Sequence, residues 1–342
     1  MNNSKNILVT GGAGYIGSHT VVDLIQNGFN PIIVDDFRNA QKSSVAGIEE
    51  IIGRSIEVRE VDVCDRVGLK KVFEEFSFSG IIHFAAYKAV GESVESPLSY
   101  YRNNIVGLIN VLELSIEFKV SNFVFSSSCT VYGEPTDSKV VTENTPIQPA
   151  NSPYGNTKRI GEEIIEDVIA SGVNMKILCL RYFNPVGAHA SSLIGELPIG
   201  KPNNLLPVVT QCAIGKIPSI TVNGNDYDTI DGTCVRDYIH VLDLANAHVK
   251  GVEWLAQQEN PIVENVNIGT GKGTSVLEVI ETFEEISGLK LNWKFGERRA
   301  GDVVEIFADV TKSFNLLNWK SNLSARDAII DSWNWELKLK ND

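Results

Sequence analysis

Short apolar segments alternate with longer amphipathic segments along the first half of the chain. Each apolar run is short enough for a buried strand and is followed by a turn and then by a helical pattern. This alternation predicts a parallel sheet with right-handed crossover helices on both faces. Strands are expected at Ile7–Val9, Pro31–Val34, Ile56–Val58, Ile81–Phe84, Asn122–Ser126 and Lys176–Leu180, and helices at Gly14–Gln26, Gly68–Glu75, Leu98–Glu117 and Tyr154–Ala170.

The second half of the chain is richer in loop-forming residues. Prolines recur at positions 185, 198, 202, 207 and 218, and Asn223–Gly232 is rich in Gly, Asn and Asp, which is typical of a smaller, loop-rich domain. The segment Asp237–Val241 and the helical pattern Asp243–Trp254 that follows it are regular again. We therefore expect an α/β fold of two domains: a Rossmann-type doubly wound parallel sheet in residues 1–184 and a smaller α/β domain in residues 185–342, with residues 237–256 packing back onto the first.

The composition and charge exclude several classes of protein. Hydrophobic residues make up 43% and charged residues 21% of the 342 residues, so collagen-like and disordered chains are excluded. The 43 acidic side chains outnumber the 30 basic ones, which gives a net charge of −13 and argues against nucleic-acid or anionic-membrane partners. No apolar stretch approaches the roughly 18 residues needed to span a bilayer.

The cysteines and histidines indicate neither a disulfide framework nor a metal site. The five cysteines are an odd number without C-x-x-C spacing, so a reducing, cytoplasmic location is expected. The first apolar run, Ile7–Val9, is too short for a signal-peptide core. The five histidines have no metal-ligand spacing, so we expect no metal.

A glycine-rich loop after the first strand predicts a dinucleotide site. In Thr10–Gly17 the glycines permit a tight turn and let a pyrophosphate approach the N-terminus of the following helix. Asp35, eighteen residues beyond Gly17, supplies the carboxylate expected to hold the ribose hydroxyls. That carboxylate would repel the 2′-phosphate of NADP, so NAD is favoured as the cofactor. NADP remains the second choice because Arg38 is nearby.

A second group of residues can carry acid–base chemistry. Tyr154 and Lys158 are four residues apart on a predicted helix, so their side chains share one face and the ammonium could depress the tyrosine pKa. Such a pair also occurs by chance on surface helices. The strand Asn122–Ser126, however, runs into the hydroxyls Ser126–Ser128 at the sheet edge where ligands bind in such folds.

Together these blocks resemble the extended short-chain dehydrogenase/reductase enzymes, and within them the UDP-glucose 4-epimerases, over essentially the whole chain. The resemblance rests on the blocks Thr10–Gly17, His83–Ser93, Ser126–Gly133, Ser152–Lys158, Arg181–Gly187, Pro202–Leu205 and Gly232–Val241. It implies reversible epimerisation at carbon 4 of UDP-glucose and UDP-galactose, with a tightly held NAD that is reduced and reoxidised within each turnover. Tyr154, kept as a phenolate by Lys158 and the nicotinamide, would take the proton of the 4-hydroxyl, and Ser128 would bond the same oxygen.

The resemblance also assigns binding residues. It implies NAD contacts at Gly11, Gly14, Tyr15, Ile16, Gly17, Asp35, Asp36, Asn39, Asp62, Val63, Phe84, Ala85, Ala86, Lys88, Asn103, Tyr182 and Phe183. It implies that the C-terminal domain binds the nucleotide sugar, with contacts at Ser128, Asn184, Asn204, Leu205, Thr221, Val222, Asn223, Arg236, Tyr238, Arg299, Asp302 and Ile306. The two arginines would supply the basic pocket that the acidic chain otherwise lacks.

Two positions depart from the family pattern. Asn223 stands where many of these epimerases have an aromatic residue against the uracil. Ile306 stands where a tyrosine restricts the pocket to glucose and galactose and where a small residue admits N-acetylated sugars. Isoleucine is smaller than tyrosine but stiff, so turnover of UDP-N-acetylglucosamine and UDP-N-acetylgalactosamine is the alternative reading of substrate range.

Other functions stay open with less support. A nucleotide-sugar dehydratase would need a carboxylic acid before Val131-Tyr132-Gly133, where this chain has Cys129-Thr130. A net reductase is not excluded by the Tyr/Lys pair alone. A nonenzymatic NAD-binding sensor would not need Tyr154, Lys158 and Ser128 together. The resemblance further implies a homodimer that pairs the helices at Leu98–Glu117 and Tyr154–Ala170.

Overall fold

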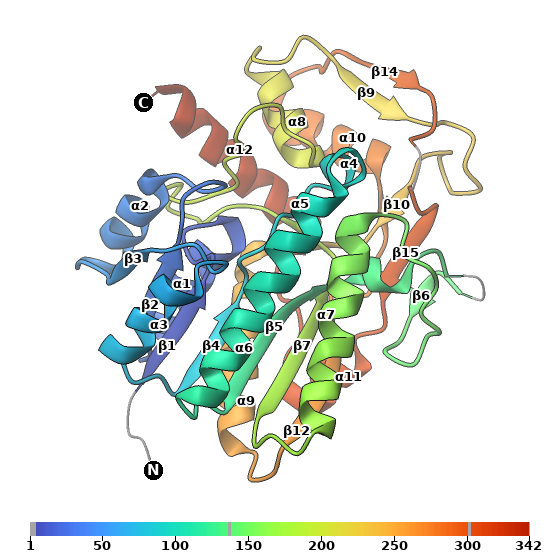
Figure 1. Cartoon of the computed structure of the whole chain (residues 1–342). Coiled ribbons are helices and arrows are strands. Elements are labelled where there is room, and N and C mark those ends of the chain that lie inside the picture. Colours follow the sequence, from blue (N-terminus) through green and yellow to red (C-terminus); the bar gives the residue numbers. More distant parts are fainter. Residues whose placement is uncertain (1–4, 136–137, 300–301, 342) are drawn as a thin grey trace.

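The computed structural model describes residues 5–135, 138–299 and 302–341, and its central feature is a seven-stranded parallel sheet (Figure 1). The strand order is β12-β7-β5-β4-β1-β2-β3. The strands are β1 (Asn6–Thr10), β2 (Asn30–Asp35), β3 (Val58–Glu60), β4 (Gly80–His83), β5 (Asn122–Ser128), β7 (Lys176–Tyr182) and β12 (Ile262–Ile268).

The six strands expected from the sequence are all present, and a seventh joins them from the C-terminal half. Strand β3 begins two residues later than expected. Strand β12 pairs with β7 along its whole length, from Ile262 opposite Lys176 to Ile268 opposite Tyr182. It was not predicted because Glu264, Asn265 and Asn267 interrupt its apolar residues. The doubly wound parallel sheet is therefore confirmed, with one more strand than predicted.

Helices cover both faces of the sheet because alternate strand residues point to opposite sides. In β1, Ile7 and Val9 belong to one apolar cluster and Leu8 to the other. The first cluster is covered by α1 (Tyr15–Gln26), α2 (Lys42–Ile52), α9 (Val241–Gln257) and α11 (Thr311–Leu317), and the second by α3 (Arg66–Glu75), α6 (Gly107–Glu117) and α7 (Pro153–Ala170). Helix α2 was not among the expected helices.

The helix expected at Leu98–Glu117 is built from several pieces. After α4 (Val90–Glu95) come α5 (Pro97–Tyr101), a π-helical segment Arg102–Val106, and then α6. Such π-helical turns are frequent at functional sites. Here the turn brings Asn103 to the edge of the sheet and buries Asn104, whose amide donates to Thr157 Oγ1 on α7 at 3.0 Å.

The C-terminal part has its own apolar core. Helices α8 (Leu205–Ala213), α10 (Val276–Ser287) and α12 (Ala325–Asn341) surround a third cluster that includes Val209, Phe283 and Ile329. Helix α9, by contrast, packs on α1, β5 and β7 of the large sheet. The remaining strands are short: β6 (Val140–Val141), β8 (Asn184–Val186), β9 (Ile220–Asn223), β10 (Val235–Arg236), β11 (Tyr238–His240), β13 (Thr274–Ser275), β14 (Trp293–Gly296) and β15 (Glu305–Ala308).

Among the helices in the described part of the chain, none is both long and apolar enough to cross a bilayer.

Candidate active site

A cleft of about 440 Å³ lies at the carboxyl ends of the parallel strands, between the sheet and the segment Gly195–Pro207. Most residues that the sequence assigned to NAD meet there, although they come from five strands and their following loops. Sixteen of the seventeen line the cleft: Gly11, Gly14, Tyr15, Ile16, Gly17, Asp35, Asp36, Asn39, Val63, Phe84, Ala85, Ala86, Lys88, Asn103, Tyr182 and Phe183. Asp62 is not part of this lining, and it is ion-paired with Arg38.

The glycines of the glycine-rich loop allow close backbone packing at the N-terminus of α1, beside the cleft. Gly11 has a φ of 71°, and a Cβ on it would lie 2.7 Å from the backbone nitrogen of Ala85. A Cβ on Gly17 would lie 2.3 Å from the carbonyl oxygen of Gly11. Helix α1 starts after Gly14 without a side-chain cap, so its first N–H groups face the cleft unbonded by a capping side chain. This cradle fits a pyrophosphate.

Asp35 forms the floor of the cleft at the end of β2. One carboxylate oxygen accepts from the backbone N–H of Ala13 and the other from that of Phe37, each at 3.0 Å. Only 8% of the residue is exposed. Burial raises the pKa of Asp35, and the two backbone donors act in the opposite direction. The carboxylate is thus fixed in orientation beside the glycine-rich loop.

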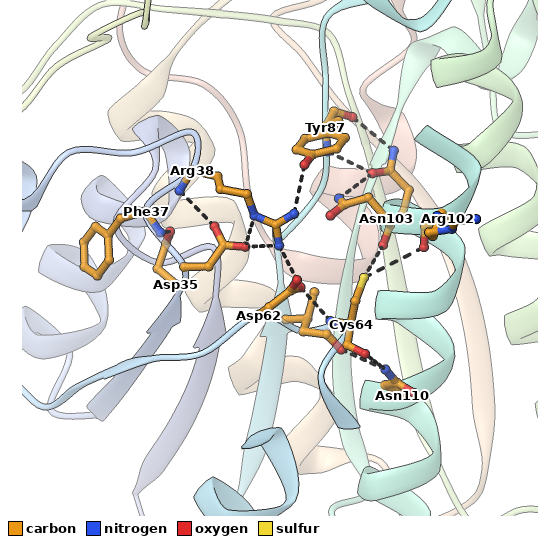
Figure 2. Close-up of polar contacts among 12 residues, drawn as sticks. Asp35, Phe37, Arg38, Asp62, Cys64, Tyr87, Arg102, Asn103 and Asn110 are labelled. Carbon is orange, nitrogen blue, oxygen red and sulfur yellow. Dashed lines mark hydrogen bonds and ion pairs between the residues drawn. The ribbon is translucent and has the colours of Figure 1, made fainter. Parts of the chain in front are cut away.

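Arg38 is paired with acidic groups. Its guanidinium contacts the carboxylates of Asp36 and Asp62 and donates to Tyr87 Oη at 3.0 Å (Figure 2). Because both neighbouring carboxylates already neutralise it, Arg38 does not present a free charge to a 2′-phosphate. This arrangement favours NAD over NADP.

The acid–base residues meet at the start of α7. Ser152 caps this helix by accepting from the N–H of Gly155 at 3.2 Å, and Pro153 occupies its first turn. Tyr154 and Lys158 both line the cleft. The ammonium of Lys158 donates to the carbonyl oxygen of Ser126 at 2.6 Å, and Ser128 lines the cleft together with Tyr154.

Burial shifts both groups toward their neutral forms. It lowers the pKa of Lys158 to about 7, an effect that the negative charge of Glu162 opposes. Burial also raises the pKa of Tyr154 to about 12, against the smaller effect of the Ser128 hydrogen bond. The sequence suggested that the ammonium depresses the tyrosine pKa, whereas in the chain alone burial is the largest effect on this pKa and raises it. A phenolate here needs a further positive charge in the cleft.

A buried ion pair holds strand β7 against α7, and a serine of β5 joins it. The carboxylate of Glu162 accepts from Arg181 Nη2 at 2.7 Å and from Ser127 Oγ at 2.5 Å. Both charged side chains are almost wholly buried, at 3% and 4% exposure. Two consecutive serines of β5 therefore contact successive turns of α7, Ser126 with Lys158 and Ser127 with Glu162. Ser128, the next residue of β5, lines the cleft as Tyr154 does. This register positions the catalytic candidates.

Glu196 is a residue of the cleft that the sequence analysis did not single out. Its side-chain oxygen accepts from the ammonium of Lys88 at 3.2 Å and from the amide of Asn204 at 2.5 Å. It thereby joins a residue assigned to NAD and one assigned to the nucleotide sugar. Glu196 lies in the sequence between the blocks Arg181–Gly187 and Pro202–Leu205, which carry the family resemblance. This position was the only sequence feature that could have pointed to it.

The residues assigned to the nucleotide sugar are more dispersed. Ser128, Asn184 and Asn204 line the cleft, whereas these nine are outside its lining: Leu205, Thr221, Val222, Asn223, Arg236, Tyr238, Arg299, Asp302 and Ile306. The two arginines converge on one carboxylate, with Asp302 Oδ1 at 3.8 Å from Arg236 and 2.6 Å from Arg299. Ile306 is 4% exposed in a cluster with Phe183, so it lies behind that lining residue.

Metal-ligating groups do not gather here. In the described residues, no three His, Cys, Asp or Glu side chains are arranged to hold a metal ion.

Comparisons with known proteins agree with this geometry. Residues 7–269 match the family model described as NAD dependent epimerase/dehydratase family. A relative from Arabidopsis thaliana named UDP-glucose 4-epimerase 2 is 48% identical over 97% of this chain and 95% of its own length, and one from Caenorhabditis elegans named UDP-glucose 4-epimerase is 44% identical over 97% and 98%. The crystal structure of UDP-glucose 4-epimerase from Bifidobacterium longum in complex with NAD⁺ and UDP is 42% identical, covers 98% of this chain and 99% of its own, and superposes with a TM-score of 0.94. The chain belongs to the NAD dependent epimerase/dehydratase family.

Proposed function

We propose that the protein is an NAD-dependent UDP-hexose 4-epimerase that interconverts UDP-glucose and UDP-galactose. The observation that carries this is the meeting of Tyr154, Lys158 and Ser128 with the glycine-rich loop and Asp35 in one cleft. Relatives and a solved structure that cover nearly the whole chain are named UDP-glucose 4-epimerases. NAD, when bound, supplies the hydride acceptor and, after the sugar turns over, the hydride donor.

The residues of the chain supply binding and proton transfer. The cradle of Gly11, Gly14 and Gly17 fits the NAD pyrophosphate, and Asp35 fits its ribose hydroxyls. The phenol of Tyr154 lies beside Ser128 and one turn from Lys158, so it can take the 4-hydroxyl proton and later return it. The cation of the nicotinamide would add the positive charge that the burial of Tyr154 demands.

The structure also supports epimerisation over elimination of water. A dehydratase needs a carboxylic acid near the sugar. At the matching positions burial raises the pKa of the Cys129 thiol to about 12, and Thr130 has only a hydroxyl. Neither group can donate as a carboxylic acid does, so the 4-keto sugar would be reduced again instead of losing water.

Purified protein incubated with UDP-galactose, without added NAD, tests the proposal. Proton NMR is expected to show UDP-glucose, and Tyr154→Phe is expected to remove this conversion. Tyr227→Phe is the matched control, because Tyr227 is buried outside the cleft. A parallel incubation with UDP-N-acetylgalactosamine tests the alternative substrate range. A kcat/KM for that sugar below about a thousandth of the UDP-galactose value would rule it out, and no conversion of UDP-galactose with NAD supplied would overturn the main proposal.

We further propose a homodimer formed through α5, the π-helical segment and α6. These elements expose an apolar stripe at helical spacing, with Leu98 79%, Val106 40%, Ile109 38% and Ile116 41% exposed. Light scattering of the Leu98→Asp/Ile109→Asp variant should then show a monomer. Val67→Asp is the matched control, since Val67 is 71% exposed on α3. A monomeric unmodified protein would contradict the proposal.

The division into an NAD-binding domain (residues 1–184 with 237–256) and a nucleotide-sugar-binding domain is also proposed, with β12 and α11 added to the first domain because they belong to its sheet and apolar cluster. The packing of α9 on α1 and β7 supports it. The cytoplasmic location is proposed on the odd number of cysteines.

A further inference from the structure

Four side chains form a continuous bridge at the adenosine half of the cleft: Arg38, Asp36, Asp62 and Tyr87, here called the Arg38 bridge. Arg38 Nε donates to Asp36 at 2.7 Å, its Nη2 contacts both carboxylates, and its Nη1 donates to Tyr87 Oη at 3.0 Å. Figure 2 shows the Arg38 guanidinium between Asp62 and the phenol of Tyr87. Nothing in the proposed proton transfer uses this bridge.

The strand order shows what the bridge crosses. Asp36 follows β2, Asp62 follows β3 and Tyr87 follows β4. Strand β1 lies between β4 and β2, and its loop is the glycine-rich cradle. The strands β4 and β3 are three strand spacings apart, or roughly 14 Å. The Arg38 bridge joins the loop after β4 to the loops after β2 and β3, which lie on the other side of β1. It must therefore pass over the carboxyl end of β1, where the adenosine half of a dinucleotide is expected to bind.

Exposure indicates that the bridge is on the solvent side of this space. The Arg38 side chain is 45% exposed, whereas Asp35 on the floor is 8% exposed. Arg38 and Tyr87 both line the cleft, as does Asp35. A ribose bonded to Asp35 would thus lie between the floor and the bridge.

Both ends of the bridge are held by backbone contacts. Asn104 accepts from the N–H of Tyr87 at 2.8 Å and donates to its carbonyl at 3.0 Å. Asp36 accepts from the N–H of Arg38 at 2.9 Å, and Asp62 accepts from that of Cys64 at 2.8 Å. The anchors are fixed, and the Arg38 side chain is the part that can swing away.

We propose that the Arg38 bridge is a clasp that retains NAD in the cleft between turnovers, with Arg38 as a cofactor-positioning residue. The inference deepens the proposed function, in which the same NAD is reduced and reoxidised, but it requires only that NAD binds. Release of NAD then requires the guanidinium to leave two carboxylates and a phenol. Because these groups are partly exposed, salt should weaken the clasp.

The rate of NAD release from the holoenzyme tests this proposal without any sugar. Holoenzyme is diluted into alcohol dehydrogenase and ethanol, so that each released NAD becomes fluorescent NADH. Arg38→Met keeps much of the apolar stem but removes the charge, and release is expected to be about tenfold faster, because bonds between ionised groups are the strong ones. Tyr87→Phe removes one neutral partner and should give a smaller increase.

The matched control is Arg59→Met. Arg59 also bridges two carboxylates, Glu57 and Glu75, but lies outside the cleft lining, so the rate of NAD release should equal that of the unmodified protein.

Raising NaCl from about 0.05 to about 0.5 M should speed NAD release from the unmodified protein and not from Arg38→Met. Release from Arg38→Met at the unmodified rate or slower, or an equal salt effect in both, would overturn the proposal. If Arg38→Met does not fold, the Tyr87→Phe variant is used in its place, and an unchanged rate of NAD release from that variant would overturn the proposal. A protein without epimerase activity would still give these results, so failure of the proposed function is distinguishable.

Discussion

Replacing His248 by phenylalanine should flatten the decline in stability at acidic pH. His248 is completely buried on α9, with its ring centroid 4.6 Å from that of Phe84 and 5.8 Å from that of Tyr182. Its Nδ1 is 2.8 Å from the carbonyl oxygen of Leu244. Its Nε2 has no hydrogen-bond partner within the residues that the structure covers. Protonation would therefore place an unpaired charge in the core.

The size of the effect follows from the pKa. Burial lowers the pKa of His248 from 6.5 to about 4, although the Leu244 carbonyl acts the other way. The neutral His248 ring contributes stability above pH 6.5, and this stability is lost as the pH falls toward 4. The reason is that the imidazole of the unfolded chain binds a proton at a higher pH than the buried imidazole of the folded chain does. At pH 5 the loss is about 2 kcal/mol, and below pH 4 it reaches about 3 kcal/mol.

Urea unfolding of NAD-free protein between about pH 7.5 and 5 measures this loss, since 1 pKa unit corresponds to about 1.4 kcal/mol. The free energy of unfolding of His248→Phe should fall by about 2 kcal/mol less over this range than that of the unmodified protein. A ring of different shape changes stability at every pH, so only the difference in slope is diagnostic. His189→Gln is the control, because His189 is half-buried with Ser191 as a partner and should change the slope far less. Parallel pH profiles for His248→Phe would refute the reasoning.

Three further substitutions test other parts of the structure. Tyr154→Phe should lower kcat with UDP-galactose by about 10²- to 10⁴-fold while the NAD content, measured by absorbance after gel filtration, stays unchanged. Gly17→Ala should abolish NAD retention in the same measurement, because its Cβ would lie 2.3 Å from the Gly11 carbonyl oxygen; full retention would contradict the cradle. Arg181→Met should lower the urea-derived free energy of unfolding by about 3 to 5 kcal/mol, since it leaves Glu162 buried and without its ion-pair partner; a loss below about 1 kcal/mol would show that the ion pair does not hold β7 against α7.

Features that depend on nearby residues could be predicted from the sequence. The glycine-rich loop, the carboxylate at Asp35 and the four-residue spacing of Tyr154 and Lys158 depend on backbone freedom and helix geometry over one or two turns. The apolar runs that became β1, β2, β4, β5 and β7 are buried on both faces, so their composition alone marks them as strands. Strand β12 was not predicted because its Glu and Asn residues interrupt the apolar pattern of a buried strand. It is a strand because it pairs with β7 along its whole length.

Other features of the site depend on which strands become neighbours in the sheet, and only the tertiary structure determined them. The contact of Ser127 with Glu162, the joining of Lys88 and Asn204 by Glu196, and the Arg38 bridge each connect residues far apart in the chain. The same holds for the pKa of Tyr154, which burial raises although the sequence spacing to Lys158 suggested the reverse. Local sequence determines backbone conformation and spacing along one element, whereas sheet order and register determine desolvation and cross-element contacts. The candidate acid–base residues were therefore visible in the sequence, but their desolvation and the contacts between loops around the cleft were decided only by the fold.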